Sequence, residues 1–483
     1  MLTTYPYLYL ARIQMEATTP VAIQTGQADL LFDSTLVRDA NGLPTLPATS
    51  IRGVLRHLLL KDLELQNMGK EKAQAIFGYG HQDETGRDEA KSSQLQVSWG
   101  MLHDSRNIPV EGRIDLAADP VLDELSQMQP VKRERVRLND QGCAEDNGKF
   151  DVTAAPKGCR FTFELKYWSD QAEDTNWQHL LNMLQQPAFR LGSNTRSGFG
   201  AFCIQSIKQR CFDLTDPVEV KAWQNLGRSL ANDNGLTPLE DTGNTQASAA
   251  VTATLNLTAE GFIRIGGGDF ALEKEREADL YTQSEKYIHW DENNTAVVSA
   301  RVPLIPASAI KGALAHRITY HHNRIKGKFT DQIDDQTRAE IIAREQADGA
   351  RKLFGYANNT NTSVDGKRQV DGAAGQVLLN DIYLDDQVKT SQLWHNRIDR
   401  FTGGVIDGAL YSEEVLFEPA FKLQLTFLQP QQLDDEDKQA LQASLDDLCQ
   451  GRLPIGASGA RGMGSCTGTL SWSDDGQWIG EKN

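Results

Sequence analysis

The sequence predicts an α+β fold made of two tandem ferredoxin-like domains, each carrying inserted hairpins and loops. Two observations lead to this fold class. Five short motifs occur twice, in the same order, along the 483 residues, and such repetition indicates a duplicated structural unit. In each half, the hydrophobic pattern also follows the order strand, helix, strands, helix, glycine loop and strand, which is typical of a ferredoxin-like domain.

The repeated motifs begin with a proline-led segment. Leu46–Arg56 is matched by Ile305–Ala315, with proline and glycine at the same spacing and a cation before the glycine in both. One such match could be chance, but five in one order indicate duplication. The other pairs are Ile76–Tyr79 with Leu353–Tyr356, Phe161–Leu165 with Phe421–Leu425, Gly192–Gly200 with Gly456–Gly464, and Gly26 and Asp29 with Gly266 and Asp269.

The elements of each half can be assigned in order. Tyr7–Glu16 alternates as a strand does, and so does Thr252–Leu257. The proline-led segment then predicts a helix, capped by Thr49 or Ser50 in the first half and by Ser308 in the second. Further helices are expected near residues 177–187 and 437–449, and long insertions at 80–92 and 274–295.

A polar stretch separates the two halves. Residues 233–249 are rich in Gly, Thr, Asn and Ser, a composition typical of linkers. The expected division is a first domain at residues 1–232 and a second at residues 250–483.

The bulk composition is that of a globular protein of a reducing cytoplasm. No apolar run is long enough to span a membrane, so no membrane partner is expected. The six cysteines form no CxxC pair, which disfavours a zinc ribbon or a disulfide framework. The net charge is −17. Nucleic-acid binding remains open, because it depends on where the cations lie.

Two features of each half suggest contact with a phosphate backbone. A helix N-terminus attracts anions, and closely spaced glycines let backbone N–H groups approach a ligand. An ordinary capped helix and a tight turn are the alternative readings. Cations beside both features in both halves favour RNA. The candidate RNA-binding residues are Thr49, Ser50, Arg52, Arg56, Arg196, Gly198, Gly200, Ser308, Lys311, Arg317, Arg461, Gly462 and Gly464.

These motifs together resemble the RAMP superfamily of CRISPR-associated proteins. The resemblance rests on Phe-Gly after the proline-led helix, on the late glycine loop, and on Ile398–Gly404 with Gly408–Tyr411, which is similar to the family's thumb hairpin. Arg137–Asp151 is a weaker counterpart in the first half. The similarity covers nearly the whole chain and is closest to the backbone subunit of type III effector complexes.

The resemblance implies several partners. They are a guide (CRISPR) RNA held by the helix and glycine loop, a target RNA paired to it, and other effector subunits. The thumb, which carries Arg400, is implied to interrupt the pairing between guide and target.

The resemblance also implies that the protein cleaves target RNA. The family keeps a catalytic aspartate between the first strand and the proline-led helix, and Asp33 has this context within Phe32–Asp39. Such a carboxylate could hold Mg²⁺ or Mn²⁺, or position a 2′-hydroxyl for attack on its own 3′-phosphate. A turn residue without a chemical role is the alternative.

The catalytic residue of the second half is ambiguous. Counting from Gly266 gives Glu273, with Asp269 nearby, whereas counting back from Pro306 gives Asp291. We expect Asp291, because it precedes a short apolar strand as Asp33 does.

Three other readings compete with this one. A purely structural guide-binding subunit would leave both aspartates idle. A guide-processing nuclease would rely on a histidine, for which the first half offers His57, His81, His103 and His179, and the pair His321-His322 could act as acid and base. A dinucleotide enzyme is disfavoured, because neither glycine loop reads Gly-x-Gly-x-x-Gly after a strand.

Overall fold

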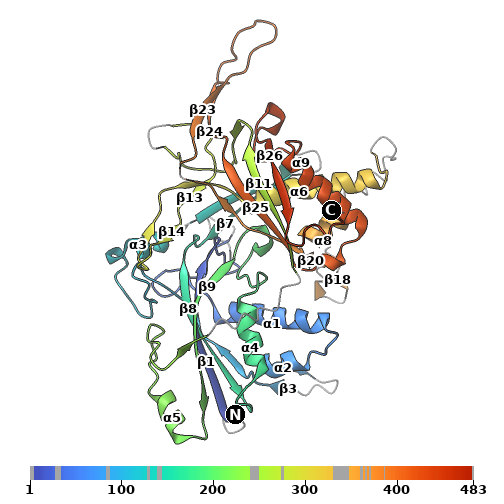
Figure 1. Ribbon diagram of the computed structural model, residues 1–483. Helices are drawn as coiled ribbons and strands as arrows, with labels where there is room; N and C mark the ends of the chain where they lie inside the picture. Colours follow the sequence, from blue (N-terminus) through green and yellow to red (C-terminus); the bar gives the residue numbers. More distant parts are fainter. Residues whose placement is uncertain are drawn as a thin grey trace.

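The structure is a computed structural model that describes most of the chain in two domains (Figure 1). Asp33, Asp29 and most of the expected linker lie outside the described residues. Those residues are 5–27, 34–82, 88–127, 131–138, 144–239, 250–273, 277–329, 348–358, 363–364, 367–368, 371–385 and 387–480.

The first domain is built on an antiparallel sheet in the order β10-β9-β1-β8-β4, with β5 also paired to β8. Without β10 and β5, this is the order of a ferredoxin-like sheet. The core elements are β1 (Tyr7–Ala17), α1 (Ala48–Leu65), β4 (Leu95–Val97), β5 (Met101–Leu102), β8 (Arg160–Ser169), α4 (Thr175–Leu184) and β9 (Phe202–Asp213).

The second domain repeats this arrangement. Its sheet has the order β26-β11-β25-β21, so each strand takes the place of its counterpart in the first domain. The tandem ferredoxin-like fold is therefore confirmed. The core elements are β11 (Val251–Ala259), α6 (Ala307–Ile325), β21 (Val377–Leu379), β25 (Ala420–Phe427), α9 (Asp435–Cys449) and β26 (Cys466–Trp472).

Shorter elements surround both cores. In the first domain they are α2 (Glu71–Phe77), β2 (Tyr79–Gln82), β3 (Asp88–Lys91), α3 (Pro120–Ser126), β6 (Val131–Leu138), β7 (Ala144–Ala154), α5 (Pro217–Gln224) and β10 (Thr237–Pro238). In the second they are β12 (Phe262–Ile263), β13 (Ser284–Glu285), β14 (Ile288–Trp290), β15 (Ala296–Val298), β16 (Val302–Ile305), α8 (Asp348–Phe354), β17 (Gly355–Asn358), β18 (Ser363–Val364), β19 (Lys367–Arg368), β20 (Asp371–Ala374), β22 (Ile382–Tyr383), β23 (Thr390–His395) and β24 (Tyr411–Phe417).

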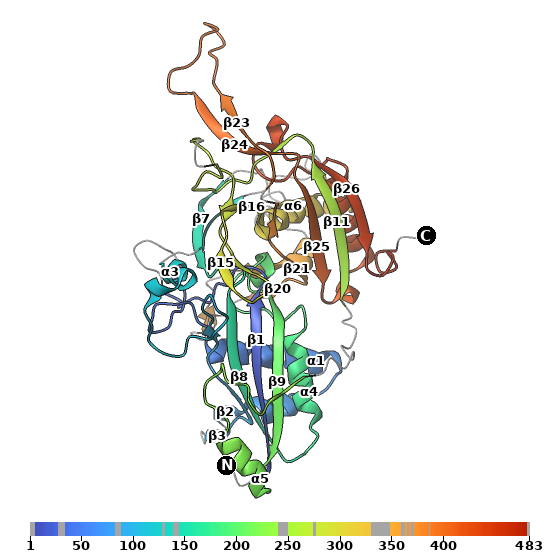
Figure 2. The ribbon, with the colours of Figure 1, turned by 60° about the vertical axis from the view of Figure 1, so that its left-hand side comes forward.

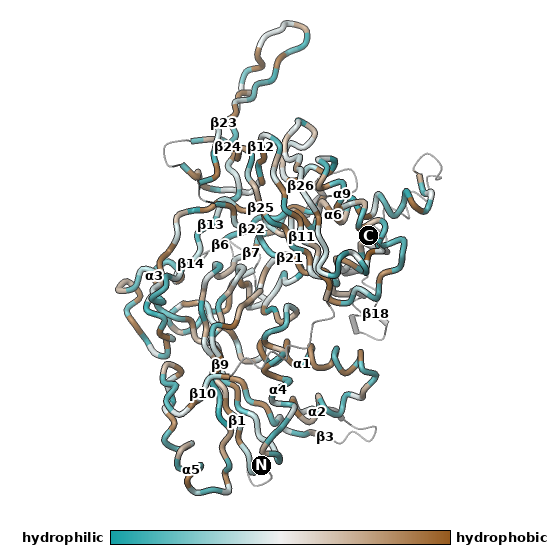
Figure 3. Tube along the Cα trace, viewed as in Figure 1, coloured by the Kyte–Doolittle hydropathy of each residue, from teal (hydrophilic) through white to brown (hydrophobic). Residues whose placement is uncertain are grey.

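Each core lies between the sheet and its two helices. Ile51 and Leu55 of α1 belong to the same core cluster as Phe163 of β8, and all three side chains are fully buried. Figure 3 shows the hydrophobic stretches along α1. Ile310 and Leu314 of α6 pack in the same way in the second domain. Burial of these apolar faces is the main stabilising term of such a layer.

The first domain extends beyond its expected end at residue 232. Thr237 and Pro238 form β10, which pairs with β9, and Leu236 is buried against Phe212 on the outer face of the sheet. Residues 233–239 thus belong to the first domain rather than to a linker.

A hairpin of the second domain completes the core of the first. Ile288 of β14 and Ala296 of β15 are buried within the first domain's core cluster. Ile288 N donates to Lys157 O (2.9 Å), and Trp290 Nε1 donates to Gly158 O (2.7 Å). Figure 2 shows β15 beside α3 of the first domain. The two domains are therefore joined by shared core packing.

Both expected thumbs are hairpins. Strand β6 pairs with β7 in the first domain, and β23 pairs with β24 in the second. The second thumb projects far from the body of the molecule, and Phe401 at its tip is 98% exposed (Figures 1 and 2). None of the described helices is both long enough and apolar enough to cross a bilayer.

Candidate RNA-binding and cleavage site

The proline-led helices begin without the expected side-chain caps. Helix α1 starts at Ala48 after Pro47, and neither Thr49 nor Ser50 caps it. Helix α6 starts at Ala307 after Pro306, which places Ser308 inside the first turn. The capping prediction was wrong because proline, whose fixed φ suits a helix entrance, occupies the cap position.

The two cations of α1 have different surroundings. Arg52 donates a hydrogen bond to Phe77 O at the end of α2, and its guanidinium lies 5.8 Å from the Phe77 ring centroid. Arg56 is exposed one turn later. Arg52 therefore joins two helices, whereas Arg56 faces solvent.

The two glycine loops share one backbone geometry. A Cβ at Gly200 would overlap Leu191 O, and a Cβ at Gly464 would overlap Ile455 O; both glycines have positive φ. These two glycines are thus required for closing the loop itself. Gly462, by contrast, has no described atom within 4 Å of a Cβ position.

The first glycine loop docks against the second domain. A Cβ at Gly198 would lie 2.6 Å from Ala307 Cβ, at the start of α6. Arg196 Nε donates to Gly375 O (2.8 Å), and Arg190 donates to Leu379 O (3.0 Å). The loop that we expected to contact RNA is therefore part of a junction between the domains.

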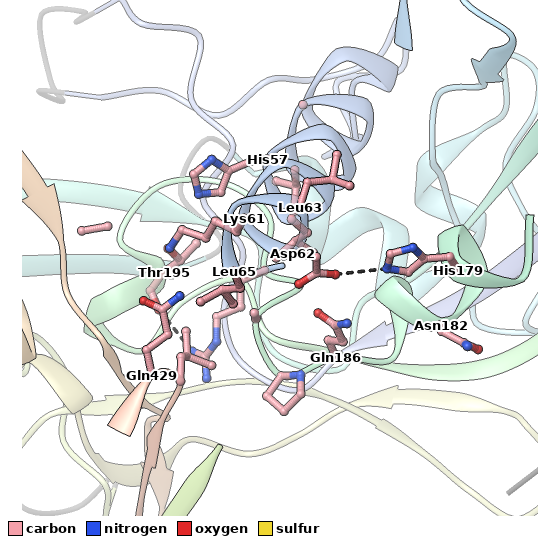
Figure 4. A pocket seen from close by; sticks show the side chains of 18 of the residues that line it. His57, Lys61, Asp62, Leu63, Leu65, His179, Asn182, Gln186, Thr195 and Gln429 are labelled. Atoms are coloured by element: carbon pink, nitrogen blue, oxygen red, sulfur yellow. Dashed lines mark hydrogen bonds and ion pairs between the residues drawn. The ribbon is translucent and has the colours of Figure 1, made fainter. Parts of the chain in front are cut away.

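A large cleft opens beside this junction. Its volume is about 1060 Å³, and α1, α4 and the first glycine loop form its walls together with Ala374, Leu428 and Gln429 of the second domain. Figure 4 shows His57 and Lys61 projecting from α1 near Thr195 of the loop. Arg190 and Arg196 also line the cleft.

Burial, with a further contribution from neighbouring cations, lowers the pKa values of several basic side chains near the cleft. Burial, followed by Arg135 and Arg196, lowers the pKa of Lys311 to about 8. Burial and then Arg196 lower the pKa of Lys61, and burial, Lys61 and Arg196 lower that of His57. Neighbouring like charges disfavour the protonated form. The site therefore gathers positive charge that an anion would stabilise.

Arg135 of the first thumb adds to this charge. Its Nη1 donates to Asn194 Oδ1 (2.7 Å), and its guanidinium lies 4.9 Å from the Phe199 ring centroid. Its Nε and Nη2 are buried without a hydrogen-bond partner among the described residues. Such donors are costly when unsatisfied. Arg135 and Lys61 were not among the residues expected to bind RNA, and His57 was considered only as a histidine for guide processing, although His57 and Lys61 follow Gly53 at helical spacing.

The remaining predicted cations lie apart from the cleft. Arg317 pairs with Asp447 of α9 (Nε–Oδ2 2.6 Å), so it fastens α6 to α9. Arg461 donates to Tyr411 Oη (2.6 Å) at the base of the second thumb and is exposed. Arg400 is exposed near the tip of that thumb.

Matching hydrogen bonds align the loops that carry the expected catalytic residues. Val37 N donates to Ile23 O in the first domain, and Gln283 N donates to Ile265 O in the second, both at 2.8 Å. Ile23 and Ile265 are themselves equivalent, because their side chains lie next to the matched glycines Gly192 and Gly456. Val37 therefore corresponds to Gln283.

This alignment places the extra residues of the second domain after Gln283. Thr45 N donates to Val37 O, and Leu304 N donates to Gln283 O, so the chain between Gln283 and Leu304 is the longer one. The strands β13, β14 and β15 occupy that stretch. Asp291 lies in this insertion, which explains why counting back from Pro306 failed.

Asp291 is an exposed turn residue. Its Oδ1 accepts hydrogen bonds from Asn293 N (2.9 Å) and Thr295 N (2.8 Å), which close the β14–β15 turn. The expectation that it corresponds to Asp33 was wrong.

Asp279 is the counterpart of Asp33, because each stands four residues before the matched pair Val37 and Gln283. Thr153 Oγ1 donates to Ser34 O and Glu414 N donates to Leu280 O, which aligns the next residue as well.

Asp279 is exposed at the base of the second thumb. Its Oδ2 accepts hydrogen bonds from Ser412 N (2.7 Å) and Ser412 Oγ (3.1 Å). Among the described residues, none donates a hydrogen bond to Oδ1. In the described part of the chain, no group of three or more His, Cys, Asp or Glu side chains is arranged to hold a metal ion.

The histidines have structural partners. His321 Nε2 lies 2.7 Å from Asp447 Oδ2, and His322 Nδ1 lies 3.2 Å from Asp437 Oδ1; both rings are buried between α6 and α9. Both histidines lie within α6. His103 is buried against Thr162, and burial lowers its pKa to about 4. His179 pairs with Asp62 (3.1 Å).

The comparison with protein families agrees with this geometry. A family model of the RAMP superfamily matches residues 14–203 and 256–467, one stretch in each domain. A comparison with curated proteins gave no match. The family indicates a CRISPR-associated, RNA-binding protein. Because the two matches cover most of both repeats, the chain belongs to the RAMP superfamily as a double-domain member.

Proposed function

We propose that the protein binds a CRISPR guide RNA as a backbone subunit of a type III effector complex, and that it cleaves the target RNA paired to this guide. The observation that carries the proposal is the cleft beside the domain junction, which is lined by the cations Lys61, Arg190 and Arg196. Lys311 lies close enough to Arg196 for their charges to interact. Phosphate contacts of this kind position a strand without reading its sequence.

The cleft borders both repeated elements. Helix α1 lines it from Gly53 onward and the glycine loop lines it with Thr195 and Arg196, whereas the first turn of α1, with Thr49 and Ser50, does not. The buried, unsatisfied donors of Arg135 lie at the same junction. A phosphate bound beside Lys311 would favour the charged form of this side chain and raise its pKa.

Binding can be tested directly. The chain is co-expressed with the genes that flank its own, and any RNA that copurifies is sequenced. Recovery of repeat-derived guides supports the proposal, whereas purification free of RNA opposes it. Lys61→Glu with Arg196→Glu should weaken binding of unrelated RNA sequences alike and flatten its salt dependence.

For cleavage, we place the chemistry at Asp33 and Asp279. A carboxylate beside the target can accept the proton of a 2′-hydroxyl as the oxygen attacks the adjacent phosphorus and the 5′-oxygen leaves, taking a proton from water. Among the described residues, no carboxylate cluster around Asp279 fits a protein-held metal ion. A requirement for Mg²⁺ or Mn²⁺ remains a prediction, and EDTA treatment of the assembled complex tests it.

A guide-binding subunit without catalysis is the second candidate. The arrangement of Asp279 favours it in one respect, because Ser412 already occupies one carboxylate oxygen. A cleavage gel with the assembled complex decides between the two: intact target in the presence of Mg²⁺ would leave the protein a purely structural subunit.

A further inference from the structure

The cleft beside the domain junction has two chemically different sides. The side formed by α1 and the first glycine loop carries the cations Lys61, Arg190 and Arg196. The side formed by α4 and the residues after it carries three neutral amides, which we call the amide row: Gln178, Asn182 and Gln186. Figure 4 shows Asn182 and Gln186 on the α4 side, away from His57 and Lys61. A ligand in the cleft therefore meets positive charge on one side and uncharged hydrogen-bonding groups on the other.

The amide row follows from the helical spacing of α4. Gln178 and Asn182 are four residues apart, so they lie on one face of the helix, and both are exposed. Gln186 continues this spacing, because the chain keeps a helical backbone at Gln185 after α4 ends. The opposite face of α4 is buried in the core through Trp177 and Leu181. The row is thus presented to the cleft by a helix whose other face is fixed.

A contact between the two sides fixes the distance across the cleft. His179 Nε2 lies 3.1 Å from Asp62 Oδ2, which joins α4 to α1. His179 follows Gln178 directly, and Asp62 follows Lys61 directly. The amide row therefore stands at a set position opposite the ammonium group of Lys61.

The three amides have free hydrogen-bonding capacity. Among the described residues, no hydrogen bond or ion pair engages their side chains. Each amide offers one oxygen that accepts and one NH₂ group that donates. A hydroxyl group both donates and accepts, so it can use both parts of an amide, whereas a phosphate oxygen can only accept. The row is suited to neutral hydroxyl groups beside a phosphate chain.

The cleft lacks the groups that stack nucleobases. No phenylalanine, tyrosine or tryptophan of the described chain lines it. Proteins that hold single strands by their bases use such aromatic side chains. A strand in this cleft is held by its phosphates and sugars instead, and the group that distinguishes the sugar of RNA from that of DNA is the 2′-hydroxyl.

We propose that the amide row binds the 2′-hydroxyl groups of the strand whose phosphates lie against Lys61 and Arg196, so that the cleft selects RNA over DNA. This inference rests on the guide binding proposed above and names the residues that give it selectivity. The hydroxyl donates to an amide oxygen and accepts from an amide NH₂ group, and a deoxyribose strand forms neither bond. Phosphate contacts alone would bind both kinds of strand alike.

The first test compares strands that differ only in the sugar. The full-length chain is washed free of nucleic acid at high salt, because its phosphate contacts weaken as salt rises. Fluorescence anisotropy then measures its affinity for oligoadenylate and oligodeoxyadenylate of equal length. RNA should bind about tenfold more tightly, as expected for about two neutral hydrogen bonds. A 2′-fluoro oligoadenylate, which keeps the sugar shape of RNA but cannot donate, should bind about as weakly as the DNA.

The second test removes the amides. Asn182→Leu combined with Gln186→Leu should weaken RNA binding about five- to tenfold and leave DNA binding unchanged, since leucine is similar in size and favours helix. Gln185→Leu is the matched control, because Gln185 is exposed beside the row but does not line the cleft; it should keep the wild-type preference. Lys61→Gln should weaken RNA and DNA binding alike.

Three results would overturn the proposal: equal affinity of the wild-type chain for RNA and DNA, tight binding of the 2′-fluoro strand, or a double variant that loses RNA and DNA binding equally. Thermal unfolding of each variant shows whether it is folded. Equal binding of RNA and DNA would leave the proposed guide binding intact, whereas a wild-type chain that binds neither strand would refute both proposals.

Discussion

Raising the pH should weaken RNA binding through Lys311. Burial and the cations Arg135 and Arg196 lower its pKa to about 8 in the free protein. A bound phosphate favours the charged ammonium, so the free protein must take up a proton wherever Lys311 is neutral. For a pKa of about 8, the fraction protonated falls from about nine-tenths at pH 7 to about one-tenth at pH 9, which predicts about tenfold weaker binding at pH 9.

The assay is fluorescence anisotropy with a labelled oligoadenylate at constant ionic strength, because adenine does not lose a proton in this range. Lys311→Arg should bind with little pH dependence, since a guanidinium stays protonated. Lys326→Arg is the matched control on the same helix; Lys326 pairs with Glu436 (3.2 Å), and this variant should keep the wild-type pH profile. A wild-type affinity that is flat from pH 7 to 9, or an unchanged profile in Lys311→Arg, would refute the assignment of Lys311 to the phosphate site.

Three further results are expected. On a cleavage gel of the assembled complex, Asp279→Asn should slow one cut by about 100-fold and leave target binding intact, whereas Asp291→Asn should keep every product; loss of a product in Asp291→Asn alone would restore the earlier assignment. Arg133→Ala should lower the free energy of unfolding by about 3–5 kcal/mol in urea, because it leaves two buried carboxylates unpaired; a loss below about 1 kcal/mol would contradict this. Gly464→Ala should lower the melting temperature more than Gly462→Ala does. Both glycines have positive φ, but only at Gly464 would the added Cβ also overlap a carbonyl oxygen; equal shifts would contradict this explanation.

Most of the fold could be predicted from the sequence, because local patterns carry it. The alternation of apolar and polar residues predicted β1 and β11, and apolar residues at helical spacing predicted α1 and α6. The glycine loops were found because positive φ and close backbone approach restrict Gly200 and Gly464 to glycine. The thumb motifs also marked the hairpins, since Ile398–Leu410 lies between β23 and β24, although the tip of the first thumb falls outside the described residues.

The parts that failed depend on distant contacts. Counting could not locate Asp279, because the insertion at β13–β15 sits on one side of the aspartate only, and only strand pairing reveals which side. The ion pairs of Arg317 and His321 could not be predicted from the sequence, because their partner Asp447 lies more than a hundred residues away. The pKa of Lys311 is lowered first by burial and then by Arg135 and Arg196 of the first domain, and no local pattern connects these two residues to α6.

The β14–β15 hairpin has a consequence for how the chain is made. Ile288 and Ala296 complete the core of the first domain, yet they follow it by some fifty residues or more. During synthesis at roughly 5–20 residues per second, the amino-terminal half must wait several seconds for these side chains to leave the ribosome. Until then it exposes the apolar site that they fill, and a chain terminated at residue 239 would never fill it. The first domain therefore completes its core only after part of the second domain has been synthesised. Premature termination should leave the first domain prone to aggregation and proteolysis.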